Sequence, residues 1–140
     1  MGEKSIRNIN GENAYSDDLT VYPEQIVALA KNPKHFGRMN DPTSSAVIKG
    51  PCGDKMEFYL FIDNNIIQEA KFYTNGCIST IVCGEMTAQL AQGKNVNEAL
   101  EISPKQVKES LQELPKSHNH CSILAVSTLY RAIAGYLLKK

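Results

Sequence analysis

Three cysteines stand where short connecting segments meet predicted helices or strands. Cys52 lies within residues 50–54 (GPCGD), whose glycines and proline predict a sharp loop. Cys77 comes where a predicted strand gives way to a helix, and Cys121 where a polar loop leads into the last helix. Free amide groups and the dipole at a helix N-terminus stabilise a thiolate, so Cys77 and Cys121 are expected to be nucleophilic and to bind metal.

The fourth cysteine, Cys83, follows Cys77 on the same predicted helix. Their separation corresponds to about 240° of rotation around a regular α-helix, so the two side chains point to different faces. They therefore cannot bind one metal ion together. We expect Cys83 to be packed in the core as a small apolar residue, and a redox or alternative ligand role is the competing interpretation.

Two other side chains accompany the cysteines. Asp54 closes the loop that holds Cys52, and it is either an oxygen ligand or a residue that stabilises the turn. His120 precedes Cys121 and is a metal ligand, a group that exchanges a proton with the thiol, or simply a capping or solvated histidine. Three thiolates with one Asp or His form an incomplete soft ligand set. Such a set holds zinc or ferrous iron, or an iron–sulfur cluster more loosely than four thiolates.

Strand patterns precede most of the helix patterns along the chain. Alternating apolar residues on both sides of Asp63-Asn64-Asn65 predict a β-hairpin. The predicted strands cover residues 45–49, 56–62 and 66–74, and the predicted helices cover residues 24–32, 78–92, 95–98, 104–111 and 121–138. This order predicts an α+β fold, in which a small three-stranded antiparallel sheet packs against several helices and the C-terminal helix is long.

Length and composition fit one folded domain. The chain has 140 residues, of which 42% are hydrophobic, enough for a single core. We expect residues 1–20 to form a flexible N-terminal tail and residues 21–140 to form the domain. Lys and Arg together number 15, as do Asp and Glu, so the charge balance predicts neither a nucleic-acid partner nor an anionic membrane surface.

The expected location is the cytoplasm. We find no run that approaches the roughly 18 apolar residues of a membrane span, and the polar N-terminal segment does not resemble a secretory signal. In a reducing compartment, four cysteines indicate metal or thiol chemistry rather than a disulfide framework.

Around the cysteines the chain resembles the iron–sulfur cluster assembly scaffold family, which comprises IscU and the N-terminal domain of NifU. The resemblance covers most of the chain, from Pro23 to Tyr136. Five segments carry it in order: residues 32–37 (NPKHFG), 50–54 (GPCGD), 75–79 (NGCIS), 93–94 (GK) with 98–100 (EAL), and 114–115 (LP) followed by 120–122 (HCS). Together they make a far more specific match than any one segment alone.

The resemblance implies a three-stranded antiparallel sheet with packed helices and a role as scaffold rather than enzyme. Cys52, Cys77 and Cys121 would bind the cluster, with Asp54 or His120 completing the site. A cysteine desulfurase would deliver persulfide sulfur to Cys121, and Fe²⁺ and electrons would come from other partners. The labile two-iron, two-sulfide (2Fe-2S) cluster would then pass to apo-proteins, and Asp54 would keep it labile. Zn²⁺ is the other ion that the resting site could hold.

The alternative function is a zinc-dependent sulfurtransferase that accepts sulfur from a desulfurase. The insertion between Cys77 and Cys121 that marks this branch of the family is missing here. The chaperone-recognition stretch of the best-known branch, Leu-Pro-Pro-Val-Lys, is reduced to its first two residues within residues 114–118 (LPKSH). A chaperone partner would therefore have to recognise a degenerate motif. The resemblance leaves open whether two copies share a cluster as a homodimer.

Overall fold

The computed structural model describes residues 22–51, 53–112 and 119–139. Cys52 and the chaperone-type stretch at residues 114–118 lie outside the described residues, and so does the predicted N-terminal tail. The described elements confirm the predicted α+β architecture, with every predicted strand and helix present within a few residues of its expected bounds.

The sheet has three antiparallel strands in the order β1-β2-β3, formed by Ser44–Lys49, Lys55–Asp63 and Ile66–Thr74. Phe58 in the central strand pairs with Ala46 on one side and Phe72 on the other. Asn64 and Asn65 join β2 to β3, and both have positive φ angles, 55° and 62°. Two such residues form the tight turn whose twist matches a hairpin, and asparagine tolerates this conformation better than most residues.

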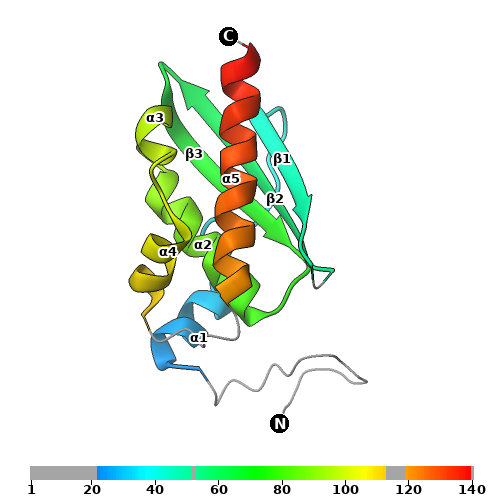
Figure 1. Ribbon diagram of the computed structural model, residues 1–140, viewed down its shortest axis with the longest axis vertical. Helices are drawn as coiled ribbons and strands as arrows, with labels where there is room; N and C mark the ends of the chain where they lie inside the picture. The colour runs from blue at the N-terminus through cyan, green and yellow to red at the C-terminus, as the bar shows by residue number, and fades with distance from the viewer. Residues whose placement is uncertain (1–21, 52, 113–118, 140) are drawn as a thin grey trace.

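Helices cover one face of the sheet (Figure 1). The long helix α5 (Asn119–Lys139) crosses the strands, and α2 (Ile78–Ala91) packs against both β3 and α5. Of the shorter helices, α1 (Glu24–Lys31) packs against α2, and α4 (Pro104–Leu111) packs against both α2 and α5. The single turn of α3 (Val96–Ala99) lies between α2 and α4 in the chain. The alternating residues of β2 that face the helices, among them Met56, Phe58 and Leu60, are completely buried.

The helix ends follow the sequence signals. Gly93 follows the C-cap of α2 with a φ of 92°, a conformation in which glycine has no steric penalty. Asn95 and Glu98 form the two hydrogen bonds of a capping box at α3. Ser103 accepts a hydrogen bond from the amide of Gln106 at the start of α4, where Pro104 occupies the first turn.

Helix α5 is long and apolar enough, by length and composition alone, to cross a membrane. The expectation that no segment would reach this length and apolarity was therefore wrong. Half of its most apolar window is buried inside the domain, because α5 packs against β1, β2, α2 and α4. A core helix that packs on several sides passes the same test as a membrane span, so its apolar character is accounted for by the fold.

The connection between α1 and β1 runs along the outer edge of β3 and forms hydrogen bonds with both α2 and β3. On the helix side, the buried carboxylate of Glu85 lies 2.9 Å from the His35 amide, 2.8 Å from His35 Nδ1 and 2.9 Å from Gln89 Nε2. Main-chain hydrogen bonds of His35 and Gly37 join the connection to the outer edge of β3 at Phe72. The sequence assigned no partner to His35, because Glu85 is distant in the chain.

Arg38 anchors the same connection on the opposite face of the sheet. Its guanidinium donates to both carboxylate oxygens of Glu57, at 2.9 and 3.2 Å, and lies 3.9 Å from the ring centre of Tyr73. The hydrogen bond from Arg38 lowers the pKa of the Glu57 carboxyl, although partial burial acts in the other direction. This pair keeps a buried carboxylate ionised on the side of the sheet that the helices leave uncovered.

The contact between α2 and β3 leaves no room for a side chain at Gly84. A Cβ there would lie 2.5 Å from the ring of Phe72, which is completely buried. We predict that Gly84→Ala lowers the free energy of unfolding by about 1–2 kcal/mol, because the steric cost outweighs the gain in helix propensity. Urea denaturation measures the change. Gly135→Ala in α5 is the matched control, since its Cβ would meet only the Ser44 hydroxyl at 3.1 Å; equal effects would contradict the prediction.

Candidate functional site: two thiols and a carboxylate around one hydroxyl

Cys77 and Cys121 come together where α2 and α5 begin. Cys77 is the N-cap residue of α2, and Cys121 lies in the first turn of α5. Both helices start at the same end of the sheet (Figure 1). Their sulfur atoms lie 3.8 Å and 3.4 Å from the hydroxyl oxygen of Thr80. The structure thus brings together two of the three cysteines that the sequence assigned to one site, and it buries both.

Asp54 reaches the same hydroxyl from the turn between β1 and β2. Thr80 Oγ1 donates to Asp54 Oδ2 at 2.9 Å. The turn is closed by hydrogen bonds from the Gly50 amide to the Asp54 carbonyl and from the Gly53 amide to the Gly50 carbonyl, at 2.6 and 3.0 Å. Asp54 therefore sits beside the thiols.

Gly76 is required by this arrangement. A Cβ at Gly76 would lie 2.7 Å from Thr80 Cβ and 2.9 Å from Asp54 Oδ2, both closer than real contacts allow. The absence of a side chain at this position lets the Asp54 carboxylate approach the first turn of α2. The Asn75-Gly76 pair that marked the end of the strand in the sequence thus also makes room for the site.

His120 lies beside Cys121. Its Nε2 atom is 3.7 Å from the Cys121 sulfur, within reach of a hydrogen bond to sulfur. Of the roles considered from the sequence, this position fits proton exchange with the thiol and also a place in a ligand set. A histidine remote from the thiol would have fitted neither.

The pKa values of the two buried thiols are shifted in opposite directions. The Cys121 thiol, acting as donor, together with the amides of Thr80 and Ser79 at the helix N-terminus, lowers the pKa of Cys77 to about 5 despite burial. The same interaction with Cys77, followed by burial, raises the pKa of Cys121. These opposite directions are those of two thiols that share one proton. Cys77 follows the expectation for a helix N-terminus, whereas the raised pKa of Cys121 is opposite to it, because burial and the neighbouring Cys77 outweigh the effect of the helix.

Cys83 is placed apart from this pair. It is completely buried in the hydrophobic core, and burial raises the pKa of its thiol. A protonated, desolvated thiol is a poor nucleophile and a poor ligand. The position agrees with the expectation that Cys83 is a packed apolar residue.

The described residues do not complete a ligand set on their own. Within residues 22–51, 53–112 and 119–139, no group of three or more His, Cys, Asp or Glu side chains is arranged to hold a metal ion. Two sulfurs and a carboxylate around one hydroxyl are nevertheless the donor types that zinc, ferrous iron or an iron–sulfur cluster would use. The role of Cys52, the remaining predicted ligand, stays a prediction.

Thr80 is the site residue that sequence analysis missed. It lies three positions after Cys77, a spacing that places two side chains on the same face of a helix. That spacing was the available signal, but a threonine three residues after a helix cap is common and usually structural. Its contact with Asp54 depends on how the β1–β2 turn packs, which spacing along the chain does not reveal.

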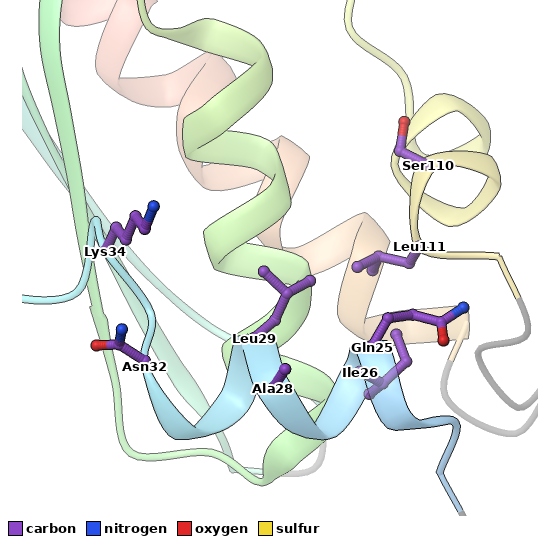
Figure 2. A pocket seen from close by; sticks show the side chains of 8 residues that line it. All are labelled: Gln25, Ile26, Ala28, Leu29, Asn32, Lys34, Ser110 and Leu111. Carbon is purple, nitrogen blue, oxygen red and sulfur yellow. The ribbon is translucent and has the colours of Figure 1, made fainter.

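A separate groove lies between α1 and α4 (Figure 2). Its volume is about 430 Å³, and its walls include Ile26 and Leu29 from α1 and Leu111 from α4. Lys34 is the one charged residue among those that line it. Because its lining contains neither a thiol nor a carboxylate, the groove lacks the chemistry of the cysteine site.

Comparison with known proteins places the chain in a family. The model of the NifU-like N terminal domain matches residues 21–140. The chain belongs to this family. It is 37% identical to the iron-sulfur cluster assembly scaffold protein IscU 1 of Archaeoglobus fulgidus, over 85% of this chain and 78% of that protein. It is 34% identical to the scaffold protein IscU of Escherichia coli K12, over 85% of this chain and 96% of that protein.

Solved structures agree on the fold. The N-terminal NifU-like protein of Brucella abortus superposes with a TM-score of 0.66 at 15% identity, covering 89% of this chain and all of that one. A putative scaffold protein for the SUF system from Fervidobacterium islandicum gives 0.67 at 21% identity, covering 83% and 98%. The family and the fold predicted from the sequence are both confirmed.

The shared proton can be tested by titration of a metal-free variant that lacks Cys52 and Cys83. We predict that one thiolate forms near pH 5, because the Cys121 thiol and the amides of α2 stabilise the anion of Cys77. Adding Cys121→Ala removes a donor to that anion, so the midpoint should move to higher pH. Ultraviolet thiolate absorbance follows the titration. An unchanged midpoint in the Cys121→Ala variant would show that the two sulfurs do not share a proton.

Proposed function

We propose that this protein is a scaffold on which an iron–sulfur cluster is assembled and from which the cluster is transferred to apo-proteins. The observation that carries the proposal is the convergence of Cys77, Cys121 and Asp54 on one hydroxyl at the ends of three separate elements. Donors held by different elements can release a cluster through small movements of a loop or a helix end. A site for permanent electron transfer benefits from four thiolates instead.

Cys121 is proposed as the acceptor of sulfur from a cysteine desulfurase. Its sulfur must first lose a proton, for which His120, with its Nε2 atom 3.7 Å from that sulfur, is the neighbouring base. The Cys121 thiolate then attacks the outer sulfur of the donor persulfide. A new S–S bond forms on Cys121, the S–S bond of the donor breaks, and the donor cysteine leaves as a thiolate. A reductant from another partner must supply two electrons per sulfur to give sulfide.

The cargo is proposed to be a labile 2Fe-2S cluster built from Fe²⁺ and held by Cys52, Cys77 and Cys121. Asp54 or His120 completes the set. A carboxylate is a harder ligand than a thiolate, so iron in a sulfide cluster holds it less firmly. Zn²⁺ fits the same donors in the resting protein, because two thiolates with oxygen or imidazole suit tetrahedral zinc.

The zinc-dependent sulfurtransferase is the less favoured alternative. Relatives such as IscU 1 of Archaeoglobus fulgidus and IscU of Escherichia coli K12 are named as scaffold proteins, which supports a carrier rather than an enzyme that turns over. The proposed partners are a cysteine desulfurase and apo iron–sulfur proteins in the cytoplasm. A chaperone would have to recognise residues 114–118, which keep only two positions of the motif, and sharing of a cluster within a homodimer remains part of the proposal.

Anaerobic reconstitution tests the function. Protein incubated with Fe²⁺, cysteine, a reductant and a desulfurase should develop the visible charge-transfer absorbance of an iron–sulfur cluster, with iron and sulfide quantified together. We predict that Cys52→Ala, Cys77→Ala and Cys121→Ala each abolish stable cluster formation, because each removes a thiolate ligand. The matched control is Cys83→Ala, which should assemble a cluster normally and cost about 1 kcal/mol or less of stability.

Two outcomes would overturn the scaffold proposal. One is a wild-type protein that stays colourless and binds neither iron nor sulfide under these conditions. The other is tightly held zinc with catalytic stimulation of the desulfurase and no cluster, which would favour the sulfurtransferase. Bound zinc alone would decide nothing, since the same donors take zinc adventitiously.

The lability assigned to Asp54 gives a separate prediction. Asp54→Ala should lengthen the lifetime of the reconstituted cluster, because it removes the weakly held ligand position through which the cluster leaves. Bleaching of the visible absorbance under a chelator measures the lifetime. Equal or faster bleaching would remove Asp54 from the release step.

A further inference from the structure

One buried hydroxyl connects the two described thiols and the carboxylate of the cysteine site. Thr80 Oγ1 lies 2.9 Å from Asp54 Oδ2, 3.4 Å from Cys121 Sγ and 3.8 Å from Cys77 Sγ. These three residues come from the β1–β2 turn, the first turn of α5 and the N-cap of α2. Thr80 itself is completely buried, so its hydroxyl depends on these neighbours for its hydrogen bonds.

The proton count of the hydroxyl fixes the direction of its hydrogen bonds. A threonine hydroxyl has one proton to donate and two lone pairs to accept. An ionised carboxylate can only accept, so the Thr80 proton points to Asp54. The 3.4 Å contact between the hydroxyl oxygen and Cys121 Sγ then involves a lone pair of Thr80 and not its proton.

Holding one oxygen of a carboxylate also orients the other. With Oδ2 tied to Thr80, rotation of the Asp54 carboxylate is restricted, and Oδ1 keeps a defined direction. In metal sites, such hydrogen bonds to a ligand carboxylate orient the ligand, and their removal commonly costs about 10–100-fold in metal affinity. The hydrogen bond between Thr80 and Asp54 has the same form.

We propose that Thr80 is a positioning residue that orients Asp54 toward the metal and cluster site. The proposal rests on the proposed function only in that Asp54 contributes to that site. Thr80 acts through Asp54, so its hydroxyl affects ion affinity and cluster release to the extent that Asp54 does. A role in packing alone would need only the volume of the side chain, which valine supplies without the hydroxyl.

The test is the Zn²⁺ affinity of the apo-protein, measured by competition with a chromophoric chelator at fixed pH. Thr80→Val should weaken Zn²⁺ binding by about 10–100-fold, whereas Thr80→Ser, which keeps the hydroxyl, should restore most of the affinity. The matched control is Thr87→Val, which also removes a buried threonine hydroxyl from α2, but one that donates to the Cys83 carbonyl. It should leave the Zn²⁺ affinity unchanged, and thermal unfolding checks that each variant folds.

A double-mutant cycle identifies the route of the effect. Asp54→Ala should weaken Zn²⁺ binding by itself, and adding Thr80→Val to it should cause little further loss, because the two residues act as one unit. Thr80→Val should also lengthen the cluster lifetime in the same direction as Asp54→Ala.

Wild-type Zn²⁺ affinity in a folded Thr80→Val variant would overturn the assignment, as would an undiminished Thr80→Val effect in the Asp54→Ala background. Both results would leave the scaffold proposal standing. Conversely, if the protein failed to assemble clusters, the Zn²⁺ affinities of the Thr80→Val and Asp54→Ala variants would still test the role of Thr80.

Discussion

Close packing of α2 and α5 on one face of the sheet is the constraint on which the site depends. Both helices begin at the same end of the strands, so the residues of their first turns meet there. The β1–β2 turn reaches the same end and adds Asp54. Gly84 lets α2 lie directly on Phe72, and Gly76 lets the turn approach α2. A wider spacing at either glycine would separate the thiols from the carboxylate.

A proton shared between Cys77 and Cys121 lowers the energetic cost of burying the two sulfurs side by side. Two buried thiolates side by side would repel each other without water to screen them, and two neutral thiols would have little reactivity. One thiolate on Cys77, stabilised by amides and by the neighbouring thiol, avoids both extremes. The pair therefore keeps a thiolate ligand available at Cys77 inside an otherwise desolvated corner.

Local signals along the chain predicted most of the fold and part of the site. The Asn64-Asn65 turn, the capping box at Asn95 and the N-cap position of Cys77 each depend on neighbours within a few residues. Thr80 with Asp54 and His35 with Glu85 could not be predicted in this way, because each pair joins elements whose relative position follows from packing. We expected no segment as long and apolar as a membrane span, but α5 is one. A helix that is buried on several sides lacks the polar stripe that usually marks a surface helix.

The fastening of the α1–β1 connection along β3 has a consequence for behaviour at high concentration. An outermost strand with unpaired main-chain groups is a template for association with another molecule. Here the amide and carbonyl of Phe72 are already occupied by His35 and Gly37 of the same chain. By holding His35 in place, the Glu85 carboxylate helps to keep these main-chain groups of β3 paired within the chain, so a buried acidic side chain on α2 contributes to closing one edge of the sheet to association.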